Sequence, residues 1–260
     1  MKKISVGQIL NVLVTVAVLT INILANALPI NGQNTGEISD RFAIYFVPAG
    51  YVFSIWGLIY LGLIAFAIYQ ALPKNRDTLW LKRITPYYIL GNFANIVWIF
   101  LWHYNQFPLT LIAMLVILGS LLAITVALMK TSDARGAGVR WFVKAPFSLY
   151  VGWISVATVA NVTQVLYFLN WGGWGIAPEV WALMMLVVAA VIAGLNLVLR
   201  RDNIYVLVFV WAYIGIAVQH NTTALVMLPA ALLAGALGLL VVLNLFGFMK
   251  PASKVPLATA

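Results

Sequence analysis

Tryptophan and amide side chains are the groups in this sequence best suited to recognise a small molecule, because several of them lie inside long apolar segments. Those well within such segments are Trp56, Trp98, Trp153, Trp211, Asn92, Asn95, Asn161 and Gln164. Asn92 and Asn95 are three residues apart, and so are Asn161 and Gln164, so each pair shares one face of a helix. Flat aromatic walls with a few polar anchors are typical of a small-molecule site. Alternatively, the amides hydrogen-bond one helix to another within a membrane.

Ionisable side chains, by contrast, are confined to polar breaks, tails and the edges of the apolar segments. Carriers that couple transport to ions or protons usually place such a group at membrane depth, so we expect no coupling. His103 and His220 lie near segment ends, where we expect interfacial histidines with one solvated nitrogen; a haem or metal ligand is the alternative. The sequence has no cysteine and no hydrolase motif, so we predict no catalytic residue, no metal site and no required cofactor.

The composition indicates which elements must position these side chains. Hydrophobic residues make up 64% of the 260 residues and charged residues only 8%, which is too few charges to coat a soluble domain. We therefore predict an all-α integral membrane protein, a polytopic bundle of about eight helices that contacts membrane lipids and has no nucleic-acid partner. The expected spans lie near residues 5–28, 48–72, 85–105, 107–130, 146–170, 178–199, 203–219 and 223–249.

The basic residues predict the orientation of these spans. With a cytoplasmic N terminus, every Lys and Arg except Arg41 falls in an inside segment, as the positive-inside rule requires. The inside residues are Lys2, Lys3, Lys74, Arg76, Lys82, Arg83, Lys130, Arg135, Arg140, Lys144, Arg200, Arg201, Lys250 and Lys254. Both termini are then cytoplasmic, and we expect a bacterial inner (plasma) membrane. The first segment also fits a cleavable secretory signal, but its apolar stretch is longer than usual for one, so we expect it to remain as a helix.

Three segments of the chain form an ordered set of motifs. The run from Pro48 to Tyr60 reads PAGYVFSIWGLIY, the run from Asn95 to Trp98 reads NIVW, and residues 146–161 read PFSLYVGWISVATVAN. In this order and spacing they resemble the TspO/MBR family, known as translocator protein or tryptophan-rich sensory protein. The resemblance covers residues 1–170. The chain departs from the family pattern where Tyr51 replaces a tryptophan and Ser54-Ile55 replaces a Gly-Pro pair.

The resemblance implies a five-helix bundle over residues 1–170, with a cavity capped by the outer loop, residues 29–47. Residues 171–260 would add a three-helix membrane extension. The positions that would line the cavity are Trp56, Asn95, Trp98, Trp153, Ala157 and Asn161. We expect Trp153 in the inner half, as the floor of the cavity, because the fifth span is predicted to begin at Pro146. Arg41 either attracts a carboxylate of the ligand or is a solvated loop charge.

The family binds tetrapyrroles such as protoporphyrin and, in animals, sterols and synthetic drugs. The resemblance therefore implies a non-enzymatic binder or sensor of an apolar, planar small molecule, with facilitated movement of that molecule as a further role. Two alternatives remain open. One is an uncoupled transporter of small molecules, and the other is a membrane enzyme acting on a porphyrin or an isoprenoid.

Two further patterns concern the surface of the bundle. Tryptophans near segment ends fit interfacial belts; these are Trp80, Trp141, Trp171, Trp174 and Trp181. Small residues at spacing four allow helices to approach closely; these are Ala190, Gly194, Ala230, Ala234 and Gly238. We expect this packing within the chain, with a homo-oligomer contact as the alternative.

Overall fold

The computed structural model describes residues 4–248, and the regular structure of that range is helical throughout. The long helices are α1 (Val6–Ala27), α3 (Ile55–Ala71), α4 (Leu79–His103), α5 (Phe107–Met129), α7 (Ala145–Phe168), α8 (Pro178–Arg200), α9 (Asn203–Gln219) and α10 (Ala224–Leu245). The short elements are α2 (Thr35–Ser39), α6 (Ala137–Val139), a π-helical turn at Arg140–Lys144, and 3-10 turns at Ile30–Gly32, Gly50–Ser54, Pro73–Asn75 and Gly173–Gly175. The prediction of an all-α polytopic bundle is confirmed.

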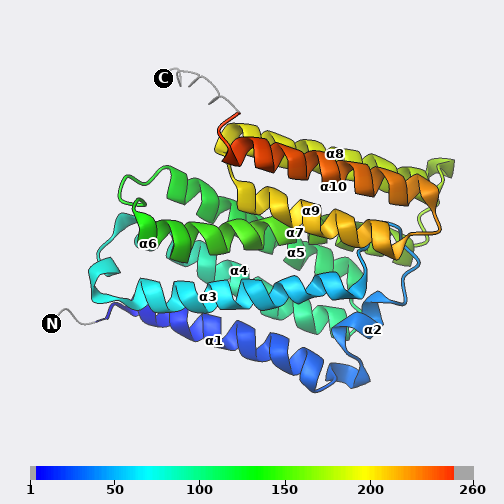
Figure 1. Ribbon diagram of the computed structural model, residues 1–260. Helices are drawn as coiled ribbons and strands as arrows, with labels where there is room; N and C mark the ends of the chain where they lie inside the picture. Colours follow the sequence, from blue (N-terminus) through cyan, green and yellow to red (C-terminus); the bar gives the residue numbers. More distant parts are fainter. Residues whose placement is uncertain (1–3, 249–260) are drawn as a thin grey trace.

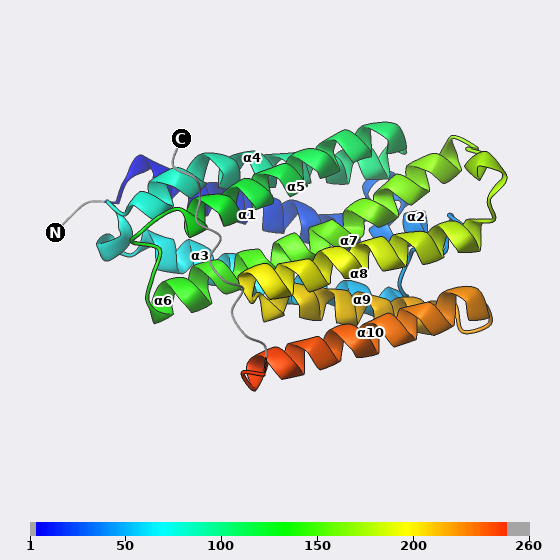
Figure 2. The same ribbon diagram turned by 90° about the horizontal axis from the view of Figure 1, so that it is seen from above.

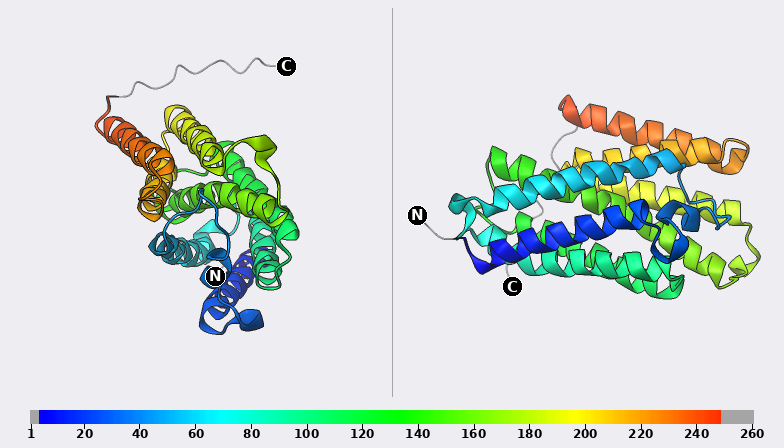
Figure 3. Two further views of the ribbon diagram at one scale, coloured as in Figure 1. Left: turned by 90° about the vertical axis from the view of Figure 1, so that its right-hand side faces the viewer. Right: turned by 90° about the horizontal axis from the view of Figure 1, so that it is seen from below.

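The long helices form two groups that lie side by side (Figure 1). In the first group, α4 packs on α5 and α1, while α7 packs on α5 and α3. In the second, α9 packs on α8 and α10, and its contact with α7 joins the two groups. The view from above shows α10 along the edge opposite α4 and α5 (Figure 2), and the end-on view shows α8 and α10 on the side away from α1 (Figure 3). The division into domains of residues 1–170 and 171–260 stays a prediction.

Seven helical segments within residues 4–248 are long and apolar enough to cross a membrane. The eighth expected span, α9, has 17 residues and is about 26 Å long, slightly less than the roughly 30 Å of bilayer hydrocarbon. Successive long helices alternate in direction, so α1 begins and α10 ends at the same end of the bundle (Figure 1). Lys2, Lys3, Lys250 and Lys254, which contributed to the charge argument, lie outside the described residues.

Two helices begin earlier than the sequence predicted. The third span begins at Leu79 rather than near residue 85, because the Asp133 carboxylate accepts hydrogen bonds from the backbone nitrogens of Leu79 (2.7 Å) and Trp80 (3.2 Å) and so caps the helix. The fifth span runs as one continuous helix of 32 residues, Ala137–Phe168. Trp153 therefore lies near the middle of this helical segment, and its depth in the inner half of the membrane stays a prediction.

α1 is attached to the bundle mainly through polar side chains. Gln8 Nε2 donates to the backbone oxygen of Gln70 (2.6 Å), and the hydroxyls of Thr15 and Tyr88 are 2.6 Å apart. Amides and hydroxyls at membrane depth need partners, and each such interhelical bond contributes roughly 0.6–2 kcal/mol. The polar face of α1 thus fixes this helix against α3 and α4.

The tryptophans predicted to form interfacial belts separate into two kinds. Trp174 and Trp141 are 79% and 60% exposed, as belt residues should be. Trp80 is only 1% exposed and stacks on Tyr69, with ring centroids 6.4 Å apart. The belt prediction is therefore wrong for Trp80, because α4 extends past it and carries it into the core.

Candidate ligand-binding cavity

A cavity of about 440 Å³ lies between the loop after α1 and helices α3, α4, α5 and α7. This volume is within the range of roughly 300–1,000 Å³ found for small-molecule sites. Its lining includes all of the residues predicted for the site, namely Trp56, Asn95, Trp98, Trp153, Ala157 and Asn161. Asn34, Thr35 and Ser39 line it from the loop side. That these residues bind a ligand stays a prediction.

One wall of the cavity is built from rings of α3 and α7. Trp153 meets the rings of Phe53 and Trp56 edge to face, with centroids 5.7 and 6.4 Å away. Trp56 also stacks on Tyr60, one turn further along α3, at 5.6 Å. Trp153 thus lies beside the first turns of α3. That it forms the floor of the cavity stays a prediction.

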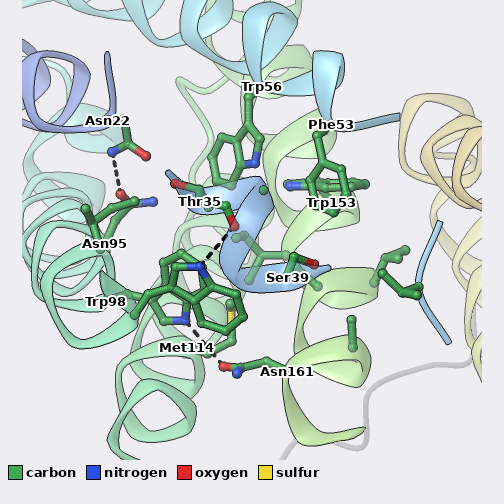
Figure 4. Close-up of a pocket in the computed structure, with 18 of the residues that line it drawn as sticks. Asn22, Thr35, Ser39, Phe53, Trp56, Asn95, Trp98, Met114, Trp153 and Asn161 are labelled. Atoms are coloured by element: carbon green, nitrogen blue, oxygen red, sulfur yellow. Dashed lines mark hydrogen bonds between the residues drawn. The ribbon is translucent and has the colours of Figure 1, made fainter. Parts of the chain in front are cut away.

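The other wall is the indole of Trp98, which faces Trp56 and Trp153 across the cavity (Figure 4). Trp98 stacks on Trp102 with an interplanar angle of 16° and a centroid distance of 5.0 Å. Its Nε1 donates to Oδ1 of Asn161 (3.3 Å). Asn161 is held in turn by a 2.9 Å bond from its Nδ2 to the hydroxyl of Thr110. This chain fixes the plane of the Trp98 ring.

The cavity amides join helices to one another. Asn95 Oδ1 accepts a 2.8 Å bond from Asn22 Nδ2, which links α4 to α1 (Figure 4). Asn95 Nδ2 donates to the hydroxyl of Tyr150 in α7 (2.9 Å). The interhelical alternative for these amides therefore matches the bonds observed for Asn95 and Asn161, each of which uses one N–H and one oxygen lone pair in them. Asn92, on the same face of α4, donates to the backbone oxygen of Tyr88 and does not line the cavity.

Charges are sparse around the cavity. The lining contains no Lys, Arg or His among the described residues, and its one carboxylate is that of Asp40, which is exposed. Arg41 is not in the lining; its guanidinium donates to Asn105 Oδ1 (2.6 Å) and lies over the ring of Phe107, 5.8 Å from the centroid. Arg41 is thus an exposed loop charge with partners of its own, and its attraction of a ligand carboxylate stays untested.

The two histidines occupy different environments. His103 is fully buried, with Nδ1 2.8 Å from the backbone oxygen of Ile99 and Nε2 3.5 Å from the hydroxyl of Thr35. The expectation of a solvated interfacial nitrogen is wrong for His103, because the loop after α1 folds over it. His220 is half-buried, and its Nε2 lies 3.3 Å from the backbone oxygen of Val47. In residues 4–248, no group of three or more His, Asp or Glu side chains is placed to hold a metal ion.

The sequence did not indicate that α8 and α9 hold the segment beside the cavity. The hydroxyl of Tyr45 donates to Glu179 Oε1 of α8 (2.7 Å), and the backbone nitrogen of Ala49 donates to the oxygen of Gly215 of α9 (3.1 Å). Residues 47–50, which contribute Val47, Pro48 and Gly50 to the lining, are thereby tied to α9. We call residues 47–50 the cavity lip. These contacts join residues more than a hundred positions apart, so no local pattern signals them.

Comparison with protein families finds a match to the family described as TSPO-like protein, over residues 8–243. Searches of curated proteins and of solved structures found no match. The family match continues beyond residue 170, where the sequence motifs end, and covers α8, α9 and nearly all of α10.

Proposed function

The chain belongs to the TSPO-like protein family, and from this premise we propose that it binds an apolar, planar small molecule inside the membrane. The expected ligand is a tetrapyrrole such as protoporphyrin. The observation that carries the proposal is the cavity in which Trp98 faces Trp56 and Trp153 (Figure 4). A flat ring system between these walls would stack on indoles, each contact contributing about 0.5–1.5 kcal/mol beyond the burial of apolar area.

The residues of the cavity favour binding over chemistry. The lining has no buried acid or base, since Asp40 is exposed and the remaining polar groups are amides, hydroxyls and indoles. Proton transfer in catalysis needs a positioned group with a suitable pKa. The proposed role is therefore that of a binder or sensor. The same lack of a buried charge fits uncoupled, facilitated movement of the ligand as a second candidate role.

The protein is an integral multi-pass membrane protein, and we propose that both termini are cytoplasmic in a bacterial plasma membrane. The end of the bundle where α1 begins carries the described basic residues other than Arg41, including Lys74, Arg83 and Arg140. This asymmetry supports a cytoplasmic location for that end. Of the small residues of α8 and α10, Ala190, Ala230 and Ala234 are buried within the chain, as expected for packing between its own helices. A homo-oligomer remains a separate part of the proposal.

Titration of the purified protein in lipid nanodiscs with protoporphyrin tests the ligand assignment, with a sterol and a retinoid as controls. We expect saturable protoporphyrin binding that Trp98→Ala and Trp153→Ala weaken several-fold or more. Trp141→Ala is the matched control, because Trp141 is 60% exposed and lies at the opposite end of the bundle. Absence of saturable binding, or equal losses in the Trp141 and Trp153 variants, would count against the proposal.

A further inference from the structure

The cavity lining contains a buried hydrogen-bond donor with no partner. Of the fully buried side-chain polar atoms without a partner in residues 4–248, only the Nε1 of Trp153 belongs to a lining residue. The side chain of Trp153 is 2% exposed. An indole nitrogen only donates hydrogen bonds, so the partner of Trp153 Nε1 must be an acceptor atom. A buried donor without a partner is unfavourable, and the cavity is the space from which a partner can come.

The direction of this donor is fixed by its neighbours. The ring of Trp153 meets Phe53 at an interplanar angle of 87° and Trp56 at 83°, and it is carried by the middle of a continuous helix. Its nitrogen points into the cavity (Figure 4). These ring contacts hold the plane of the indole, so its nitrogen stays directed toward the cavity.

Three other donors of the cavity already have hydrogen-bond partners. Trp98 Nε1 donates to Asn161, Trp102 Nε1 donates to the backbone oxygen of Thr35 (3.3 Å), and Asn95 Nδ2 donates to Tyr150. The amide of Gln164 and the hydroxyl of Tyr60 also line the cavity and make no side-chain hydrogen bond in the described chain. Trp153 Nε1 differs from them because it is the unpartnered lining donor that is fully shielded from solvent. Trp56, which is half-buried, is the nearest competing indole donor.

The charges of the lining indicate what kind of acceptor fits. A carboxylate placed at Trp153 would be buried without a compensating Lys, Arg or His, and an uncompensated buried charge is strongly unfavourable. The acidic group of Asp40 adds a like charge at the exposed side. An uncharged acceptor, such as a carbonyl or ether oxygen or a ring nitrogen, meets neither penalty.

We propose that the ligand of this cavity carries an uncharged hydrogen-bond acceptor on the edge of its apolar ring system, and that Trp153 Nε1–H donates to this acceptor. The inference rests on the proposed function, because it assumes that a flat ligand enters between Trp98 and Trp153, and it narrows the ligand class. A tetrapyrrole meets this requirement if a neutral acceptor on its ring edge lies at Trp153 and its carboxylates remain outside the buried part of the cavity.

Fluorene and fluorenone are matched probes for this donor, since they share a planar tricyclic framework and fluorenone adds a carbonyl oxygen. We expect wild-type protein in lipid nanodiscs to bind fluorenone about threefold to tenfold more tightly than fluorene, measured by titration calorimetry against empty nanodiscs. Trp153→Phe keeps an aromatic ring but removes the N–H. It should abolish the preference for fluorenone over fluorene, and this ratio is the readout because loss of the larger indole can weaken the binding of both probes. For each variant we take the ratio of the fluorenone affinity to the fluorene affinity. Because both probes partition into the same lipid in every sample, comparing this ratio between variants removes the effect of partitioning.

Trp56→Phe is the matched control and should retain the preference for fluorenone. A preference that is absent from the wild type, persists in Trp153→Phe or disappears in Trp56→Phe would overturn the inference while leaving ring binding intact. Failure of both probes and of protoporphyrin to bind would overturn the proposed function itself.

A second measurement uses the wild-type protein and does not depend on the folding of a variant. With nitrogen-15 in the indole rings, fluorenone should shift one indole N–H resonance downfield and fluorene should leave it near its free position. Equal responses to the two probes would also overturn the inference.

Discussion

The indole nitrogen of Trp211, in the middle of α9, donates a 3.1 Å hydrogen bond to the backbone oxygen of Val52, just before α3 begins. These residues are 159 positions apart. One turn further along α9, Gly215 accepts a bond from Ala49 of the cavity lip. The C-terminal helices, which the sequence motifs treated as an extension, are therefore bonded to the segment that borders the cavity. This arrangement agrees with a family match that runs to residue 243.

Trp211→Phe should loosen the segment between the cavity lip and α3 without removing the aromatic ring. The phenyl ring can keep the edge-to-face contact with Tyr51, now at 5.4 Å, but the bond to Val52 is lost. One lost hydrogen bond costs about 0.5–1.5 kcal/mol, so we expect protoporphyrin to dissociate a few-fold faster, as measured by stopped-flow fluorescence. Trp141→Phe is the control. An unchanged dissociation rate in the Trp211 variant would show that the bond does not restrain the ligand.

Gly215→Ala should separate α9 from the lip by steric overlap. A Cβ at this position would overlap the side chain of Val52 and lie 3.0 Å from Cβ of Pro48. Overpacking of a buried contact typically costs about 1–3 kcal/mol, so we expect a lower midpoint of thermal unfolding together with weaker ligand binding. Gly235→Ala is the matched control in α10, because nothing lies within 4 Å of its added Cβ. Equal thermal stability of the two variants would contradict the proposed close contact.

The overall architecture could be predicted from the sequence because it depends on local composition. Apolar runs of membrane length define the helices, and a residue such as Pro108 marks where α5 starts. The start of α4 could not be predicted, since α4 is capped by Asp133, which is distant in sequence. The start of α7 was predicted to within one residue, but the π-helical turn that precedes it was not. The polar face of α1 had a readable signal in the spacing of Gln8, Asn11, Thr15 and Asn22.

For the cavity, the sequence indicated which aromatic and amide residues lie around one space but not how they are bonded. The motif spacing brings Trp56, Trp98 and Trp153 into the same lining. Whether an amide faces a ligand or a neighbouring helix depends on the rotation and height of two helices. A single sequence does not contain that information, as the bonds of Asn95 to α1 and α7 illustrate.

Asn95→Leu should lower the stability of the folded protein even when no ligand is present. It removes the bonds to Asn22 and Tyr150 and leaves buried polar atoms unpaired, which costs about 1–3 kcal/mol. We expect a lower midpoint of thermal unfolding for the ligand-free protein. Gln164→Leu is the control, because Gln164 lines the same cavity and no side-chain hydrogen bond is recorded for it. If the two variants unfolded at the same temperature, the structural role of Asn95 would be refuted.

The hydrogen bond between His220 and Val47, which attaches the cavity lip to the end of α9, should weaken at acidic pH. Burial lowers the pKa of His220 below its ordinary value of about 6.5, although its hydrogen bond to Val47 works against the shift. The neutral imidazole is thus favoured in the attached state, whereas a released His220 binds a proton more readily. The stabilisation is complete above about pH 6.5 and is lost as the pH falls from there through the lowered pKa.

We therefore expect protoporphyrin to dissociate faster as the pH falls from about 7 to about 5. His220→Gln should reduce this pH dependence, because its amide can still donate to Val47 but does not titrate. The titratable neighbours are Tyr45, whose ring centroid is 5.3 Å from that of His220, and Glu179, which accepts the hydrogen bond of Tyr45. An identical pH profile in the wild type and in the His220 variant would exclude His220 as the titrating group.

The orientation of the spans can be tested with single cysteines, because the natural sequence has none. Gln33 lies beyond the end of α1 and Arg135 lies between α5 and α6, at opposite ends of the bundle. If the basic end is cytoplasmic, Gln33→Cys should react with a membrane-impermeant maleimide in intact cells and Arg135→Cys only after permeabilisation. Phe246→Cys, at an exposed position after α10, should behave like Arg135→Cys. Labelling of Phe246→Cys together with Gln33→Cys would mean that α9 does not cross the membrane, and labelling of Gln33→Cys together with Arg135→Cys would overturn the topology.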